Sequence, residues 1–245
     1  MTTHVSTRTP GRIAAVDIAR TLALVGMVVF HFAWDLEMFG HLPAGTVSSG
    51  AWPGFARLVA GSFLFLAGVS LVLAHGPAIR WRSALRRIGV IAAAAAAVTA
   101  ATWLAMPDRF VFFGILHSIA VASLLGLAFL RAPVTLTLAI AGAVLVLPLV
   151  FRSAFFDPPW LVWIGLSERR PVTLDFEPVF PWFAPCLLGI AAARLAGRFG
   201  LWDALHRAGA PGRLARWAGW PGRHSLVIYL AHQPLLIGGL WAVAR

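Results

Sequence analysis

Charged residues are scarce in this chain of 245 residues. They make up 12% of the sequence, whereas soluble domains carry about a quarter. Lysine is absent, so all 20 basic residues are arginine, and Cys186 is the only cysteine, which excludes a disulfide within the chain. We find no nucleotide-binding glycine loop, zinc-ligand spacing or internal repeat, and we predict no metal site. A hydrophobic content of 60% and a mean hydropathy of +0.82 predict an integral membrane protein.

Seven apolar segments are each close to the length of about 20 residues that a helix needs to cross a bilayer. Pro133 provides the break between the fourth and the fifth. We therefore predict an all-α polytopic membrane protein in which residues 1–245 form a single transmembrane domain of about seven helices. The segments are 13–34, 52–74, 84–106, 110–130, 133–151, 178–197 and 224–243.

The arginines predict the orientation of the chain. They cluster between the apolar segments, so the net charge of +11 does not indicate a nucleic-acid partner. With the N-terminus in the cytoplasm, 13 of the 20 arginines lie inside, six lie outside and Arg20 lies within the first span. This bias favours a cytoplasmic N-terminus and an extracytoplasmic C-terminus. We expect a multi-pass protein of the cell (inner) membrane, in contact with the lipid bilayer.

The stretch 17–35, which covers most of the first apolar segment and the residue after it, carries four ionisable residues on one side if it is helical. At about 100° per residue, Asp17, Arg20, His31 and Asp35 fall within an arc of about 80°. Ionisable groups in a span normally face the interior of the bundle or an aqueous cavity. The alternative is that Asp17 with Arg20 marks the inner interface and Asp35 the outer one. We interpret the stripe as functional, with Asp17 and Arg20 binding a cofactor.

The outer end of this stripe predicts acid–base chemistry. His31 and Asp35 are four residues apart, so their side chains can touch on a helix. A carboxylate beside a histidine can fix its tautomer and raise its basicity, as a general base requires. The same pair also fits a structural ion pair. We predict that His31 and Asp35 are catalytic.

For each of several other polar residues near the apolar segments, both a functional role and a structural role fit the sequence. Arg57 is expected to pair with Asp35 or to bind substrate. His117 is a catalytic candidate or a core residue. Asp175 and Glu177 precede a proline-rich segment, whose free carbonyls would suit a cavity lining. We predict that Arg57, Asp175 and Glu177 bind substrate.

Two further groups are candidates for cofactor binding. His232 lies within the last segment and either has a function or stabilises a kink before Pro234. The basic stretch RWRSALRR at 80–87 contains Arg86 and Arg87. Topology and anionic lipid also explain this stretch. We include His232, Arg86 and Arg87 among the predicted cofactor-binding residues.

Several stretches together resemble the catalytic-domain family of heparan-α-glucosaminide N-acetyltransferase, in its short bacterial form. The resemblance covers about residues 12 to 200, and the last segment is similar to the final span of several membrane acyltransferase families. Order and spacing, rather than any one motif, carry the resemblance. The stretches are R-x-x-x-x-D-x-x-R at 12–20, M-x-x-x-H-x-x-x-D at 27–35, FLFLAGVSL at 63–71, FGILHSIA at 113–120 and DFEPVFPWFAPCLLGI at 175–190.

The resemblance implies acetyl transfer across the membrane, from acetyl-CoA on the cytoplasmic side to a glycan or amino-sugar acceptor outside. The family's lysosomal members carry a functional asparagine late in the first helix, and His31 occupies about that place. They also use a histidine in the following loop, where His41 lies within about one position. The Trp-Asn pair that follows the family histidine is absent here. The resemblance therefore leaves His31 and His41 as alternative catalytic residues.

Two hypotheses of function follow. In the first, the protein is an acyltransferase in which a His/Asp group deprotonates the acceptor or carries the acyl group as acyl-histidine. In the second, it is a non-enzymatic transporter, channel or envelope assembly factor that uses the same stripe as a polar path. A purely structural membrane protein and a homodimer are also compatible with the sequence. We favour the acyltransferase.

Overall fold

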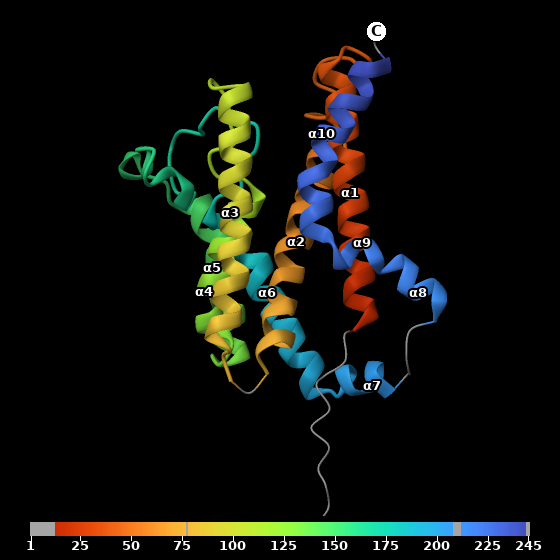
Figure 1. The fold of residues 1–245 in the computed structure, drawn as a ribbon. Coiled ribbons are helices and arrows are strands. Elements are labelled where there is room, and N and C mark those ends of the chain that lie inside the picture. The colour runs from red at the N-terminus through yellow and green to blue at the C-terminus, as the bar shows by residue number, and fades with distance from the viewer. Residues whose placement is uncertain (1–12, 77, 208–211, 244–245) are drawn as a thin grey trace, which may run out of the picture.

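The chain is almost entirely helical, as expected (Figure 1). The computed structural model describes residues 13–76, 78–207 and 212–243. Over these residues there is no strand, only an isolated bridge between Phe113 and Phe176. The longer helices are α1 (Ala14–Met38), α2 (Trp52–His75), α3 (Trp81–Ala105), α4 (Ile115–Phe129), α5 (Val134–Val150), α6 (Val179–Arg198) and α10 (Ser225–Val243). The short ones are η1 (Ala154–Phe156), η2 (Val162–Ile164), α7 (Leu201–Arg207), α8 (Arg213–Ala218) and α9 (Trp220–Arg223).

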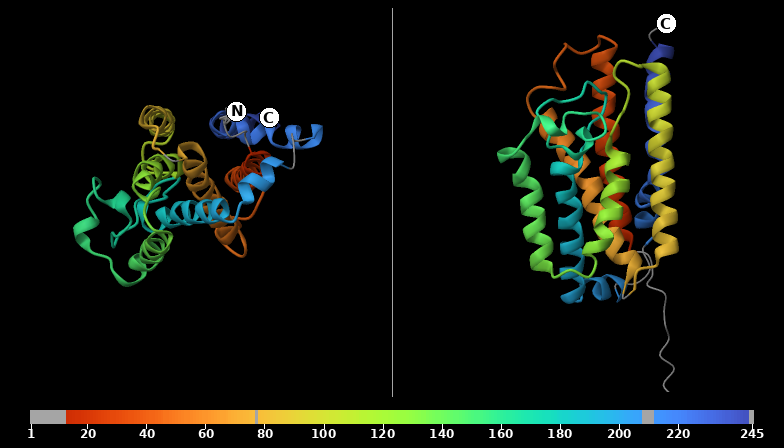
Figure 2. Two further views of the ribbon diagram at one scale, coloured as in Figure 1. Left: turned by 90° about the horizontal axis from the view of Figure 1, so that it is seen from below. Right: turned by 90° about the vertical axis from the view of Figure 1, so that its left-hand side faces the viewer.

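Five of these helices are long and apolar enough to cross a membrane, namely α1, α2, α3, α6 and α10. Helices α4 and α5 are apolar but have 15 and 17 residues. The multi-pass membrane character is thus confirmed, with five candidate spans, and the predicted count of seven is not confirmed. The start of α1 and the end of α10 lie at opposite ends of the bundle (Figures 1 and 2). That arrangement is what the predicted orientation requires, and the orientation itself stays a prediction.

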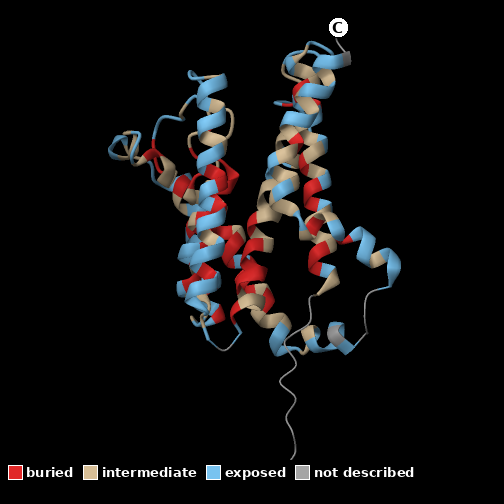
Figure 3. Cartoon of the chain, in the orientation of Figure 1, coloured by how far each residue is buried: buried red, intermediate tan, exposed pale blue. Residues whose placement is uncertain are grey.

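Helices α2 and α6 form the centre of the bundle. They lie between α3, α4 and α5 on one side and α1 and α10 on the other (Figures 1 and 2). Helix α6 packs against α2 and α5, and α1 packs against α2, α9 and α10. Buried residues concentrate along α2, α4 and α6, whereas α3 is largely exposed (Figure 3). Leu64, Leu71, Leu187 and Ile190 are fully or almost fully buried at this centre.

Two glycines allow α2 and α6 to approach closely. A Cβ added at Gly68 of α2 would collide with the backbone carbonyl oxygen of Cys186, and one at Gly189 of α6 would collide with that of Phe65. Small residues at helix contacts let backbones pack directly in a membrane, where the hydrophobic effect does not drive helices together. This contact fixes the scaffold on which the polar residues of α1 and α10 are placed.

The fourth predicted segment was drawn five residues too early. It was expected to begin at residue 110, but α4 begins at Ile115. The preceding backbone pairs with a distant loop instead, since Leu174 donates to Arg109 O at 2.8 Å and Glu177 donates to Phe113 O at 3.0 Å. These bonds satisfy backbone groups that a continuing helix would have used.

The first helix extends further than predicted. The sequence-based boundary at residue 34 placed Asp35 and Glu37 in the following loop, whereas both belong to α1, which ends at Met38. The Glu37 carboxylate accepts hydrogen bonds from the backbone N–H groups of Gly45 at 2.8 Å and Val47 at 2.9 Å. A residue at the helix end therefore organises the loop 39–51, and we call this end of the bundle the outer end.

Candidate functional site

The predicted polar stripe of α1 faces the interior of the protein. Asp17 is 2% exposed and Asp35 is not exposed at all, while Arg20 and His31 are half-buried. Leu24 and Met27, on the same stripe, are also buried. The alternative in which these residues merely mark the membrane interfaces does not explain the burial of Asp35 within the packed bundle. The stripe therefore faces the interior of the helix bundle, and its functional role stays a prediction.

Arg20 is held in place by two side chains. Its guanidinium lies 3.0 Å from the Asp17 carboxylate and donates to Ser70 Oγ of α2 at 2.5 Å. Thr21 also donates to the backbone oxygen of Asp17 at 3.1 Å. The ion pair and the serine direct Arg20 toward α2 rather than toward solvent.

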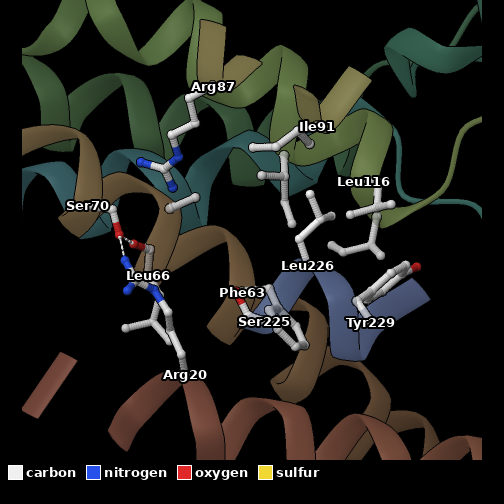
Figure 4. Close-up of a pocket in the computed structure, with 13 residues that line it drawn as sticks. Arg20, Phe63, Leu66, Ser70, Arg87, Ile91, Leu116, Ser225, Leu226 and Tyr229 are labelled. Atoms are coloured by element: carbon white, nitrogen blue, oxygen red, sulfur yellow. Dashed lines mark hydrogen bonds between the residues drawn. The ribbon is translucent and has the colours of Figure 1, made fainter. Parts of the chain in front are cut away.

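Arg20 lines a cavity of about 100 Å³, which we call the two-arginine pocket. The guanidinium groups of Arg20 and Arg87 lie at one end of it and the Tyr229 ring lies at the other (Figure 4). Apolar side chains line the space between. The pocket is bounded by Arg20, Phe63, Leu66, Ala67, Ser70, Arg87, Ile91, Ile115, Leu116, Ile119, Ser225, Leu226 and Tyr229. A cationic end joined to an apolar channel suits a ligand with phosphates at one end and an uncharged arm.

The two arginines predicted to act together are separated. Arg87 lines the two-arginine pocket, whereas Arg86 belongs to a surface hollow with Arg80, Arg82 and Trp81. Adjacent residues on a helix are about 100° apart, so they face different surroundings. The stretch 80–87 is therefore not one phosphate site, and only Arg87 joins Arg20.

The outer end of the stripe meets the last helix. The ring of His31 contacts that of His232 with centroids 4.8 Å apart, and Gln233 Nε2 donates to Asp35 Oδ1 at 2.7 Å. We call these four residues, His31, Asp35, His232 and Gln233, the outer polar cluster. The structure does not form the expected hydrogen bond between His31 and Asp35. It replaces that bond with partners from α10, because α10 packs directly against α1.

The outer polar cluster contains buried atoms whose hydrogen-bonding capacity is unused. Among the residues the structure describes, Asp35 Oδ2, His232 Nε2 and Gln233 Oε1 are buried and accept no hydrogen bond. Buried polar atoms are nearly always paired, because leaving one unpaired costs about 1–3 kcal/mol. Three such atoms in one place make this cluster the candidate binding site.

The tautomers make the cluster a set of acceptors. His31 Nδ1 bonds to the backbone oxygen of Met27 at 3.0 Å, and His232 Nδ1 bonds to that of Tyr229. A carbonyl oxygen only accepts, so in the neutral rings the proton lies on Nδ1 and the lone pair on Nε2. The three unpaired buried atoms are thus an imidazole nitrogen of His232, a carboxylate oxygen and an amide oxygen, and the neutral ring of the half-buried His31 adds a second Nε2 acceptor. Such a set binds a group that carries several N–H or O–H donors.

The cluster adjoins the two-arginine pocket. Tyr229, at the far end of the pocket, has its ring 5.4 Å from that of His232. His31 lies eleven positions after Arg20 on α1, which corresponds to a rise of about 16 Å. The structure therefore joins the predicted cofactor residues Arg20, Arg87 and His232 to the predicted catalytic residues His31 and Asp35.

His117 is bonded at both ring nitrogens. Its Nδ1 accepts from the backbone N–H of Gly114 at 3.3 Å, and its Nε2 bonds to Thr99 Oγ1 at 3.3 Å. Thr99 in turn donates to Val111 O at 2.8 Å. These bonds support the structural interpretation, in which His117 caps the start of α4. A catalytic role for His117 stays a prediction, and it would require one of these two hydrogen bonds to break.

Asp175 and Glu177 lie at the start of α4. Asp175 Oδ2 accepts from the backbone N–H of Ile115 at 2.9 Å. Burial raises the pKa of Asp175 to about 6, against the lowering effect of that hydrogen bond. Burial, and then the neighbouring Asp175, raise the pKa of Glu177 to about 9. Near neutral pH Glu177 is therefore protonated, and its buried Oε2 has no partner among the described residues.

The remaining candidates lie apart from the cluster. Arg57 is exposed on α2, and no ion pair joins it to Asp35 among the described residues, so that expected pairing is not observed. It contributes to the field at Glu177. His41 is exposed in the loop 39–51, where its backbone N–H donates to Leu36 at 2.8 Å. Of the two alternative catalytic histidines, only His31 lies in the outer polar cluster.

The sequence-based prediction omitted Ser70, Tyr229 and Gln233 from the site. Ser70 and Gln233 bond to stripe residues 50 and 198 positions away. Tyr229 is the only tyrosine of the chain, and it and His232 are three residues apart on one helix face. That spacing is a local sequence signal that could have identified Tyr229. The hydrogen bonds of Ser70 and Gln233 join residues far apart in the sequence, so no local pattern predicts them.

The fold and site define a polytopic helical membrane protein with a largely apolar pocket inside the bundle that has two arginines at one end. A sequence model of the family described as heparan-alpha-glucosaminide N-acetyltransferase, catalytic, matches residues 12–234. The chain belongs to this family. No curated protein and no solved structure matches the chain. The match ends at Pro234, so it includes His232 and Gln233 and extends beyond the limit of about residue 200 inferred from the motifs; its first residue, Arg12, lies outside the described residues. The family is one of membrane acetyltransferases, and nothing in the comparison favours the transporter hypothesis.

Proposed function

We propose that the protein transfers an acetyl group from cytoplasmic acetyl-CoA to an amine or hydroxyl of a sugar or glycan outside the membrane. One observation carries this proposal beyond the family: a buried set of hydrogen-bond acceptors adjoins a pocket that has two arginines at its far end. An acyltransferase needs a place for a polyanionic donor and a place for a nucleophile that carries hydrogen. The two-arginine pocket and the outer polar cluster meet these two needs.

The donor would bind with its phosphates at Arg20 and Arg87. Both side chains reach the same end of the pocket (Figure 4), and guanidinium groups bind phosphate through charge-assisted hydrogen bonds. The pantetheine arm is flexible and mostly uncharged, so the apolar walls formed by Phe63, Leu66 and Leu116 suit it. This places the thioester near Tyr229, beside His232.

The acceptor would bind in the outer polar cluster. An amine or hydroxyl can donate to Asp35 Oδ2, Gln233 Oε1 and an imidazole Nε2, which are the atoms left without partners. His31 Nε2 is the base we assign, because Met27 holds the proton of the neutral ring on Nδ1. Asp35 also attracts an acceptor that arrives as an ammonium group, which must give one proton to Asp35 or to solvent before the neutral amine can attack.

In the transfer step the acceptor nitrogen or oxygen attacks the thioester carbonyl carbon. The new C–N or C–O bond forms as the C–S bond breaks, and CoA leaves as the thiolate. The proton of the acceptor passes to His31 Nε2 and then to the thiolate sulfur, which gives free CoA and the acetylated acceptor. If His31 carries the acyl group first, its Nε2 attacks the thioester carbon and the C–S bond breaks to release the thiolate; the acceptor then attacks the acyl-histidine, the C–Nε2 bond breaks, and the proton of the acceptor passes to the thiolate.

The proposal is tested with purified protein in lipid vesicles and radiolabelled acetyl-CoA. Binding of the donor is measured first, and transfer of label to glucosamine or a glucosamine oligosaccharide second. We expect binding that free CoA competes away and label on the acceptor amine. No saturable binding at millimolar acetyl-CoA would refute the proposal. Labelled protein in the absence of acceptor would identify the acyl-histidine route.

The location and assembly of the protein are further parts of the proposal. We place it in the cell (inner) membrane because that membrane gives access to cytoplasmic acetyl-CoA, and we keep a homodimer as a prediction. Cross-linking in native membranes followed by electrophoresis tests the second point: a single band at the monomer mass would refute the dimer.

A further inference from the structure

Residues 213–223 lie against the start of α1 and have two contrasting faces. They form α8 and α9, which lie beside the lower half of α1, away from the outer end (Figure 1). Gly219 and Gly222 are buried, whereas Leu214 is 84% exposed and Trp217 is 73% exposed. Small residues thus face the protein and large apolar residues face away from it.

Residues 213–223 pack closely against α1. The backbone N–H of Gly222 donates to Thr21 Oγ1 at 2.9 Å, and a Cβ at Gly222 would collide with the backbone oxygen of Asp17. Gly219 is similarly close, since a Cβ there would lie 3.2 Å from Asp17 Cβ. This segment is therefore fixed relative to the first helix and is not a loosely attached loop.

Arginines accompany the exposed apolar residues. From residue 198 to residue 223 the chain has five arginines and one acidic residue, Asp203. Arg213 and Arg216 are exposed, and their guanidinium groups have no partner among the described residues. Trp220, also exposed, completes the apolar face.

This combination matches the bilayer interface. Tryptophan and leucine favour the boundary between headgroups and acyl chains, where an interfacial segment buries its apolar side. Exposed guanidinium groups beside them are complementary to anionic phosphate headgroups, and each basic residue near an anionic surface contributes about 1 kcal/mol. Binding of a soluble protein would not explain why exposed tryptophans and exposed arginines lie together in this short segment beside a membrane helix.

We propose that residues 213–223 form an interfacial anchor that binds anionic phospholipid headgroups through Arg213 and Arg216, with Leu214, Trp217 and Trp220 inserted beside them. Because Gly222 contacts α1 beside Arg20, the bound lipid also supports the arginine end of the two-arginine pocket. This last step rests on the proposed function, whereas the lipid contact does not.

The position of the anchor is tested with a nitroxide label on Trp217→Cys. The native Cys186 is fully buried, so it is retained, and the unmutated protein gives the background of labelling. In vesicles of phosphatidylcholine and phosphatidylglycerol, we expect collisions with oxygen to exceed those with a water-soluble nickel chelate. Leu149→Cys on α5 and Ser48→Cys in the loop 39–51 give the lipid and water references. Collisions equal to those at position 48 would overturn the proposal; Leu214→Cys repeats the test if the Trp217 variant does not fold.

Headgroup binding is tested with spin-labelled phosphatidylglycerol and phosphatidylcholine. We expect the wild type to prefer phosphatidylglycerol, and each of Arg213→Gln and Arg216→Gln to reduce this preference up to about fivefold. Arg198→Gln, at an exposed arginine that ends α6 outside the segment 213–223, is the matched control and should change it little. An equal effect of Arg198→Gln, or no preference in the wild type, would overturn the proposal. Neither measurement involves acetyl-CoA, so its outcome is independent of the proposed function.

Discussion

The imidazole rings of His31 and His232 meet edge to face with their centroids 4.8 Å apart. One ring comes from the first membrane helix and the other from the last, so the site is complete only when the chain is folded from end to end. Each ring uses Nδ1 for a backbone oxygen of its own helix. This leaves each Nε2 available for chemistry in the outer polar cluster.

Replacing His31 by alanine should abolish most transfer without abolishing donor binding. Loss of a general base lowers kcat by about 10²–10⁴-fold, whereas the proposed phosphate site at Arg20 lies about 16 Å away along α1. Steady-state kinetics and a separate binding measurement with acetyl-CoA check these two effects. His224→Asn, an exposed histidine just before α10, serves as the control. Full activity of His31→Ala would remove this residue from the mechanism and favour His41, for which His41→Ala is the corresponding test.

Arg87→Gln should weaken binding of acetyl-CoA by about ten- to a hundredfold, the range expected for a charge-assisted hydrogen bond to phosphate. Binding of S-acetylpantetheine should change little, because that donor lacks the nucleotide phosphates. Competition binding with the two donors measures the difference. Arg86→Gln examines the sequence-based prediction, and a larger effect there than at Arg87 would contradict the assignment from the structure.

The stripe on α1 could be predicted because helix geometry is local. Once residues 14–38 are helical, the spacing of Asp17, Arg20 and His31 fixes their common side. Its partners could not be predicted in the same way. The free energy of an exposed pair four residues apart is only about 0.2–0.5 kcal/mol, so packing of α10 against α1 readily replaces the His31–Asp35 pair by Gln233–Asp35.

The start of α4 shows the same limit in the backbone. Apolar residues continue before Ile115, so hydropathy extends the segment to residue 110. The helix begins later because Asp175, 60 residues away, accepts the Ile115 N–H. The requirement that buried backbone groups find partners is general, but which distant residue provides the partner depends on the tertiary fold.

Glu177 should make the protein less stable as the pH rises. Its pKa is about 9 in the folded protein and near 4.5 when unfolded, so between these values the folded state holds a proton that the unfolded state has lost. The contribution of Glu177 to the free energy of unfolding is therefore fully present below about pH 4.5. It falls by at most about 1.4 kcal/mol per pH unit as the pH rises, and it is lost above about pH 9. Asp175 adds the same trend between its unfolded value near 3.8 and about 6.

Thermal unfolding in detergent from pH 5 to pH 9 measures this effect. The wild-type Tm should fall over the whole range, and Glu177→Gln, which keeps a neutral side chain of the same shape, should flatten the curve above pH 6. Arg57→Gln should steepen it slightly, since Arg57 favours the charged form of Glu177. Parallel curves for the wild type and Glu177→Gln would show that this carboxyl does not carry the pH dependence.

Gly222→Ala should weaken donor binding although Gly222 is not part of the two-arginine pocket. The added methyl group would collide with the backbone oxygen of Asp17, so α9 and the start of α1 must separate, and Arg20 would lose its position beside Ser70. Gly238→Ala on α10, where a Cβ meets nothing within 4 Å, is the matched control and should stabilise its helix by about 0.5–1 kcal/mol. Isothermal titration with acetyl-CoA should show an increased Kd for Gly222→Ala and an unchanged one for Gly238→Ala. An unchanged Kd in both variants would contradict this prediction, because it would mean that the position of Arg20 does not depend on the contact between α9 and α1.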